Sequence, residues 1–332
     1  MADSKAAPVT AQRVSEGLWR LALPIRVPPG HINSWLIEDG DHWLVVDCGV
    51  RHEKIRRIWR DFMASPLYRS GISRIVLTHG HPDHSGSAAW LARETGATVL
   101  MAEAEQQAMT SLWHEEPESR RRRHEWQTQW GATDSQRQAS DQLYDGFAMG
   151  IPLIHTRIKT LQAGDTLMIG QQAWHLHAGY GHTPCNLLLH QPDRQILITG
   201  DQILPQIITN VSLWWKQAAN PLAGYLASLQ TLRQLPVSLA LPAHGEPFDH
   251  YAARCDVIEA THQRRLSRLR ESLATGPQSI DTLLDTLTGR AVHGPGYQLI
   301  AGQVFARLVY LQQQGRIVRD GADPVFRLTP GQ

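Results

Sequence analysis

The alternation of hydrophobic and polar positions divides the chain into two strand-rich stretches separated by a polar segment. Short apolar or β-branched runs, which are typical of strands, predict strands at 17–23, 31–37, 43–47, 74–77, 97–101, 166–169, 173–178, 187–190, 195–199 and 238–241. Runs with helical spacing predict helices at 54–63, 88–95, 221–235 and 251–274. The strands therefore fall into an N-terminal and a C-terminal half, and each half also contains two predicted helices.

The segment between the two halves, 103–150, is polar and rich in Gln, Arg and Trp. Its helical spacing and lack of strand signal predict a helical insertion, in which Trp126 and Trp130, four residues apart, share one helix face. Trp113, Trp126 and Trp130 could form an apolar roof over a substrate, the insertion's own core or a dimer contact. The four-arginine run 120–123 lies among glutamates, which favours a solvated helix face over a phosphate or RNA contact.

The two ends of the chain differ from the middle. Residues 1–16 are expected to be a flexible N-terminus, and 17–275 to form the main domain. After Gly276-Pro277, helices predicted at 279–287 and 298–314 precede two strands at 317–319 and 325–328. Helix, helix and hairpin in this order predict a winged-helix-like domain over 276–332. We expect its second helix, which is mostly apolar, to pack on the main domain rather than bind DNA.

Composition narrows the class of protein. The 332 residues carry 32 Lys+Arg against 31 Asp+Glu, a net charge of +1, which gives no general attraction to nucleic acid or anionic membranes. No apolar run approaches the ~18 residues of a membrane span. Three widely separated cysteines argue against a disulfide framework. Without a secretory signal, the sequence predicts a cytoplasmic globular protein. We also expect Cys185 to be a buried thiol rather than a nucleophile.

The strongest chemical signal is His79-x-His81-x-Asp83-His84, directly after the predicted strand 74–77. Side chains two apart in an extended segment point the same way, so His79 and His81 can hold one ion together. Asp83 and His84, at the turn into a helix, can face a second ion. The alternative is a solvated His-rich loop.

Further ligand types follow three later strands. His182, Asp201 and His244 each come directly after an apolar run, where loops gather over a sheet edge. Their ordered recurrence favours a metal site over a solvated loop.

These motifs resemble the metallo-β-lactamase superfamily, over residues 17–250 or so. The resemblance implies an α+β fold, an αββα sandwich of two sheets packed face to face with helices outside. It implies that His79, His81 and His182 bind one metal, that Asp83, His84 and His244 bind a second, and that Asp201 bridges the two. Asp47 matches a structural position near the site.

The ligand set is similar to that of the hydrolytic dizinc branch, which includes glyoxalase II (hydroxyacylglutathione hydrolase), lactonases, phosphodiesterases and RNA-processing nucleases. Two cations about 3.5–4 Å apart convert a shared water to hydroxide near neutral pH. Asp83 is then the catalytic residue that orients this nucleophile or relays its proton. We expect two Zn²⁺ per chain, although Mn²⁺ or Fe²⁺ fits the same ligands.

Two enzyme hypotheses follow. The first is hydrolysis of a small ester, thioester or lactone; the alternative is a metal-dependent endoribonuclease or phosphodiesterase, suggested by the winged-helix-like domain and the arginine run. A protein that holds its metals structurally is the third possibility. The predicted substrate contacts are Tyr180 and Asn210 as oxyanion donors and Trp214 in the cleft wall. The expected partner is a small molecule rather than nucleic acid or a membrane, and the insertion or the C-terminal domain could mediate a homodimer.

Overall fold

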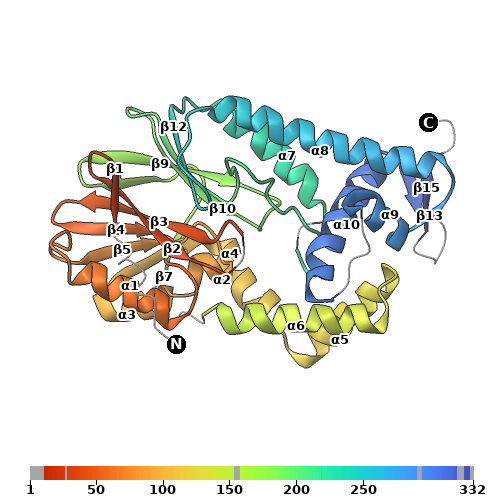
Figure 1. Cartoon of the computed structure of the whole chain (residues 1–332), viewed down its shortest axis with the longest axis horizontal. Helices are drawn as coiled ribbons and strands as arrows, with labels where there is room; N and C mark the ends of the chain where they lie inside the picture. The colour runs from red at the N-terminus through yellow and green to blue at the C-terminus, as the bar shows by residue number, and fades with distance from the viewer. Residues whose placement is uncertain are drawn as a thin grey trace, which may run out of the picture.

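Two β-sheets pack face to face in the computed structural model, which describes residues 11–26, 28–152, 158–217, 219–289, 294–319 and 325–329. Both lie at the left in Figure 1. The first sheet has the order β1 (Gln12–Ser15), β2 (Leu18–Pro24), β3 (His31–Asp39), β4 (His42–Val46), β5 (Ile72–Val76), β6 (Thr98–Ala102) and β7 (Ile158–Leu161). The second has the order β12 (Leu239–Pro242), β11 (Ile196–Gly200), β10 (Asn186–Gln191), β9 (Gln172–Gly179) and β8 (Thr166–Ile169).

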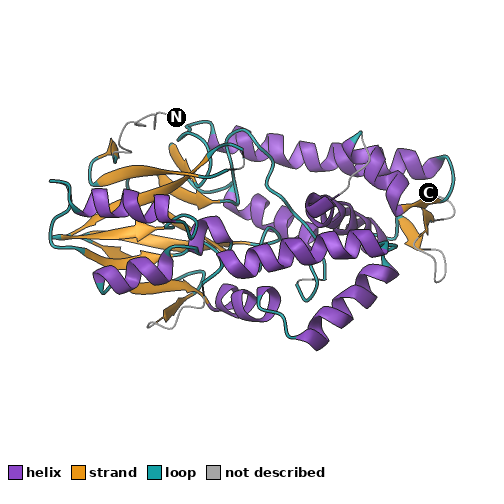
Figure 2. Ribbon diagram, turned by 60° about the horizontal axis from the view of Figure 1, so that its bottom comes forward, coloured by secondary structure: helices purple, strands orange, loops and turns teal. Residues whose placement is uncertain are grey.

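The period-two alternation of apolar residues explains this layering. In β4, Leu44 and Val46 enter the core between the sheets, whereas Trp43 and Val45 enter the core under the helices. The outer face of the first sheet is covered by α1 (Glu53–Met63) and α3 (Ala88–Thr95), and that of the second by α7 (Pro221–Leu232) and α8 (Tyr251–Ala274). Figure 2 shows these helices outside the strands. The predicted αββα sandwich is confirmed.

Strand direction decides where the loops meet. In the first sheet β4, β5 and β6 run parallel, and in the second β9, β11 and β12 run in one direction because β10 is antiparallel to β9 and β11. The loops after these strands gather at one edge of the sandwich. There the Leu187 N–H donates to the Thr78 carbonyl (2.8 Å), and the Asn33 N–H to the Ala243 carbonyl (2.7 Å), so the two sheets are tied together at this edge.

The insertion is helical, as its spacing predicted. It consists of α4 (Glu103–Ala108), a π-helical turn at Met109–Trp113, α5 (Pro117–Gln129) and α6 (Asp134–Gly150). A capping box between Thr133 and Gln136 begins α6. Trp126 and Trp130 share a face, with ring centroids 6.2 Å apart, and both pack against Phe305 near the C-terminus. The insertion thus joins the sandwich to the C-terminal segment.

That segment contains β13 (Gln278–Ser279), α9 (Ile280–Thr288), a 3-10 turn at Gly294–Gly296, α10 (Tyr297–Gln313), β14 (Ile317–Arg319) and β15 (Val325–Leu328). Its strands form a third sheet in the order β13-β15-β14. As expected, α10 packs on the main domain, where it contacts α6 and α7 and shares one hydrophobic core with α8. The order helix, helix, hairpin is confirmed; the winged-helix relationship stays a prediction.

Three short strands differ from the sequence prediction. Gln12–Ser15 forms β1 rather than part of a flexible N-terminus, because it pairs with β2; residues 1–10 lie outside the described residues, as does the predicted turn 320–323. β7 and β13 were not predicted. Among the residues described, no helix is long and apolar enough to cross a membrane.

Candidate metal centre

The segment after β5 brings the first four candidate ligands together. It leaves the buried strand at Leu77 and turns into the single helical turn α2 (Pro82–Ser85), which Pro82 begins. His79 and His84 are fully buried. His79 Nε2 lies 3.0 Å from His81 Nδ1, so two ring nitrogens face one point, as the alternation of side chains predicted.

Glycines position two of the downstream ligands. Gly181 has φ of +92°, and a Cβ there would lie 2.2 Å from the Pro221 carbonyl oxygen. Gly200 has φ of +53°, and its Cβ would lie 2.6 Å from Asn186 Oδ1. Only glycine fits these turns without strain, and each turn delivers the next residue, His182 or Asp201, to the cluster.

All seven predicted ligands converge, in overlapping groups. The donor atoms of His79, His81 and His182 lie within 4.8 Å of one another, as do those of Asp83, His84 and His244. Asp201 stands between these groups. Its Oδ2 is 3.5 Å from His182 Nε2, and its Oδ1 is 3.5 Å from both His84 Nε2 and His244 Nε2.

Outer partners fix the ring orientations. His84 Nδ1 is 2.8 Å from Asp47 Oδ2, and Thr78 donates to both oxygens of Asp47 through its N–H and its hydroxyl. His182 Nδ1 is 2.7 Å from the Asn210 carbonyl, and His244 Nδ1 is 2.9 Å from the His31 carbonyl. Each ring therefore holds Nδ1 against an oxygen and presents Nε2 to the cluster, as histidine metal ligands do.

The inward atoms lack partners of their own. His84 Nε2, His182 Nε2 and Asp201 Oδ1 are buried and have no hydrogen bond from any described residue. Leaving buried polar atoms unpaired costs about 1–3 kcal/mol each. Imidazole nitrogens and carboxylate oxygens are ligands of Zn²⁺ and similar divalent ions, so the donor set fits a bound metal.

Electrostatics distinguishes the two ends of the cluster. Burial, with His182 close by, lowers the pKa of His81 to about 3, so this ring stays neutral and free to coordinate. At the other end burial opposes the charged form of His244, but Asp201 and Asp83 raise the pKa of His244 to about 9. The carboxylates thus create a strong preference for positive charge, which a cation satisfies.

Sequence reasoning missed Glu105 at the start of α4. It is buried, its Oε2 accepts from the Gly80 N–H (2.8 Å), and its Oε1 accepts from the Cys185 N–H (2.7 Å). Burial raises its pKa. This carboxyl ties together the loops that carry His79 and His182. The only sequence signal was an acidic residue three positions after a buried strand.

The three predicted substrate contacts differ in how their side chains lie relative to the cluster. The Tyr180 side chain is 46% exposed and lines pockets that contain none of the seven ligands. Asn210 acts on the site through its backbone carbonyl, while its side-chain oxygen accepts from Ser212. Trp214 is buried behind Trp113 (ring centroids 5.3 Å apart). The side chains of the two predicted oxyanion donors, Tyr180 and Asn210, therefore do not face the cluster.

Aromatic rings of the insertion form a wall beside His81. Its ring lies 6.2 Å from Trp113 and 5.6 Å from Phe147, which stack on each other at 4.4 Å. The structure therefore divides the tryptophans: Trp113 lies at the site, whereas Trp126 packs with the C-terminal segment. Cys185 is buried, and burial raises its pKa to about 12, as expected for a structural thiol.

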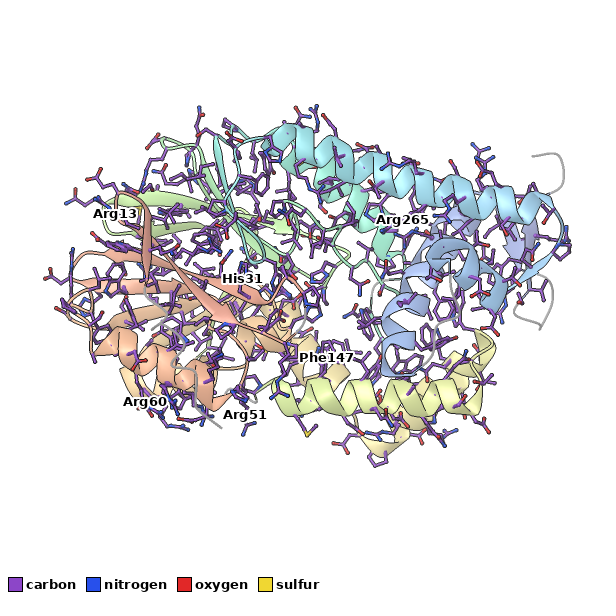
Figure 3. All side chains as sticks on the ribbon, viewed as in Figure 1. Arg13, His31, Arg51, Arg60, Phe147 and Arg265 are labelled. Carbon is purple, nitrogen blue, oxygen red and sulfur yellow. The ribbon has the colours of Figure 1, made fainter. Side chains whose placement is uncertain are left out.

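A cavity of about 810 Å³ opens onto Asp83, which alone of the seven ligands is among its lining residues. It also touches Phe147 of α6 and Leu299 of α10. Figure 3 places Phe147 at the end of α6 nearest the sheets, with Arg51 close by. The cavity therefore adjoins the cluster at Asp83.

Comparison with known proteins agrees with this geometry. Residues 27–244 match the model of the metallo-beta-lactamase superfamily. The chain is 24% identical over 270 residues to the probable metallo-hydrolase YqjP of Bacillus subtilis, covering 77% of this chain and 82% of that protein.

Two solved structures are similar over nearly the whole chain. A beta-lactamase domain protein from Burkholderia ambifaria is 28% identical with a TM-score of 0.80, covering 98% of this chain and 97% of that one. A metallo-beta-lactamase family protein from Thermus thermophilus has a TM-score of 0.81 at 23% identity, covering 95% and 100%. The combination of sandwich, insertion and C-terminal segment therefore recurs in other proteins.

Proposed function

The chain belongs to the metallo-β-lactamase superfamily, and on that premise we propose that it is a binuclear metal-dependent hydrolase that cleaves a small ester, thioester or lactone. One observation carries the proposal: Asp201 directs Oδ2 toward His182 and Oδ1 toward His84 and His244. A carboxylate with its two oxygens facing two histidine groups is arranged as a bridging ligand.

Zn²⁺ is the metal we expect, because three imidazoles and a carboxylate oxygen suit its four-coordinate preference. Two such cations, when bound, supply Lewis acidity and a water acidic enough to lose its proton near neutral pH. His79, His81 and His182 would hold one cation, and Asp83, His84 and His244 the other.

The chain's own groups then orient the reaction. Asp83 Oδ2 lies 3.3 Å from His244 Nε2 and 3.8 Å from His84 Nε2, so Oδ1 remains to orient the attacking water or accept its proton. Asp47 holds His84 in place through Nδ1. The wall of Trp113 and Phe147 excludes water from the His81 side of the cleft.

The arginine run 120–123 favours acyl substrates over phosphodiesters, because its side chains are already paired with carboxylates. Arg121 and Arg122 each bind Glu118, and Arg120 binds Asp145. Arg123 is buried and paired with Glu115. Cations already neutralised by carboxylates contribute little to binding of nucleic acid.

Metal analysis and a substrate panel test the proposal. We expect two equivalents of metal per chain and turnover of a chromogenic ester, a thioester or a lactone, with no turnover of bis(4-nitrophenyl) phosphate or a short single-stranded RNA. Asp201→Ala should lower metal content and reduce activity by more than about 100-fold, the loss that removal of an outer metal partner can already cause.

Exclusive turnover of the phosphate substrates would establish the nuclease or phosphodiesterase alternative. If Asp201→Ala kept both metal equivalents and the full rate, its bridging role would be wrong.

A further inference from the structure

The cavity beside Asp83 has apolar walls built by distant parts of the chain. Leu143 and Phe147 come from α6, Leu299 from α10, Val50 and Ile55 from the loop after β4 and from α1, and Ile25 from the loop after β2. Its volume of about 810 Å³ is within the range of pockets that enclose small organic ligands. Walls of this kind bind a hydrocarbon chain or ring by removing it from water.

The lining of the same cavity also contains cations. Arg26, Arg51 and Lys54 line it, and in the described part of the chain none of the three has a carboxylate partner. Glu53, the nearest acidic residue in sequence, is engaged by Arg56 and Arg60 instead. Arg51 also borders a second pocket of about 360 Å³, whose lining includes Arg56 and Arg93.

Only one carboxylate lies among the residues that line the 810 Å³ cavity, and it is the proposed metal ligand Asp83. The cavity lining therefore combines three features: the proposed metal ligand Asp83, an apolar wall, and cations without a carboxylate partner. A neutral apolar ligand would leave those cations unused, and a polyanion would meet the apolar wall without compensation.

We propose that the substrate is an amphipathic anion, whose apolar acyl or aryl portion packs against Leu143, Phe147 and Leu299 and whose carboxylate or phosphate binds Arg51 and Lys54. This rests on the proposed hydrolase function, because the scissile carbonyl must then lie at Asp83. It assigns to the insertion and the C-terminal segment a role in selecting substrate, since each contributes part of the wall.

Binding of non-hydrolysable ligands tests this without turnover. Three octyl phenyl ethers that differ at one ring position serve as probes: 3-octyloxybenzoate, 3-octyloxyphenyl phosphate and the neutral 3-octyloxybenzamide. Isothermal titration of the metal-loaded protein should show one or both anions binding about tenfold more tightly than the amide. 3-Methoxybenzoate, which lacks the chain, should bind at least about 100-fold more weakly than 3-octyloxybenzoate.

Variants that remove single positive charges test where the anionic group of the ligand binds. Arg51→Gln and Lys54→Gln should each reduce the preference for the anions over the amide by severalfold, without changing affinity for the amide. Arg57→Gln removes an exposed charge from α1, the helix that also contains Lys54, outside the cavity lining, and should change neither the preference nor the affinity for the amide. Comparison of the two anions identifies carboxylate or phosphate as the natural group.

Equal affinity for the anions and the amide, or an equal effect of Arg57→Gln, would overturn the inference. Its failure is separable from that of the proposed function. Anion-selective binding without hydrolysis of any ester would reject the reaction and retain the ligand class, whereas hydrolysis without anion selectivity would do the reverse.

Discussion

Two buried polar clusters in this protein differ in one respect. In the insertion, Arg123 is fully buried and donates to Glu115 (2.8 Å), Asp141 (2.8 Å) and Ser140 (3.2 Å), with its guanidinium 3.9 Å from the Tyr144 ring centre. In the ligand cluster, by contrast, buried nitrogen and oxygen atoms such as His182 Nε2 point inward without partners.

The presence or absence of partners distinguishes a cluster that stabilises the fold from one that is arranged to bind a ligand. A buried network that satisfies its own charges stabilises the fold, whereas one that leaves converging acceptors unpaired needs a cation from outside. The two clusters are also connected. Tyr144, which lies under Arg123, packs 5.4 Å from Trp113, and Trp113 lies beside His81. The self-contained network thus supports the wall of the site.

Removing Arg123 should have the largest effect on stability. Arg123→Met leaves the buried carboxylate of Glu115 without its cation, which costs about 3–5 kcal/mol. Urea denaturation measures the loss. Arg121→Met, on the same helix but exposed, should leave the midpoint unchanged. Equal midpoints for the two variants would show that the Arg123 network is not what holds the insertion together.

A substitution beside the ligand cluster should change metal affinity rather than stability. Asp47→Asn weakens the hold on His84 and should lower affinity for one of two metal equivalents by about 10–100-fold. Asparagine tolerates the positive φ of +59° at this position, so the backbone is preserved. Chelator competition gives the affinity, with exposed Asp61→Asn as the control. Unchanged affinity at both equivalents would remove Asp47 from the metal centre.

A third buried group sharpens the comparison. His262 Nε2 has no partner among the described residues, but the ring faces Arg307 (3.3 Å) rather than carboxylates, so it does not attract a cation. Burial, then Arg307 and Arg265, lower the pKa of His262 to about 3 from its ordinary 6.5.

This shift predicts a loss of stability in acid. Below pH 6.5 the unfolded chain binds a proton at His262 while the folded chain does not, so stability falls with pH down to about 3. Between pH 6.5 and 5.5 the loss from this ring is about 1 kcal/mol. His262→Gln should lose correspondingly less than wild type over that interval, and exposed His250→Gln should match wild type. Equal pH dependence in His262→Gln and wild type would contradict the assignment.

Much of the fold could be predicted because the strands that build the core are short apolar runs, such as β10 and β11, which are buried at every position. The predicted strands at 166–169 and 325–328 and the helices at 88–95 and 251–274 have the observed bounds. Edge strands such as β1 and β13 were missed, since they are short and carry few buried side chains. Their identity depends on a neighbouring strand rather than on their own pattern.

The candidate site, like the fold, could be predicted only in part. The seven side chains of the cluster could be predicted because they lie in the loops that follow apolar strands, and the ends of strands that run in one direction meet at one edge. Glu105, Phe147 and the role of the Asn210 carbonyl could not, because their contacts join segments far apart in the chain. The arginine run appeared as a solvated face; its fourth member is buried, since α6 supplies Asp141 and Ser140 to receive it.

By itself, the order of residues predicted which side chains converge in the cluster, since histidine and aspartate spacing after buried strands is a local property. Only the folded chain decided how Asp201 divides its oxygens between neighbours, which tryptophan lies at the site, and where unpaired cations border the cavity. Those features depend on distances between separate segments, and such distances are set by packing of the whole molecule rather than by any one stretch of sequence.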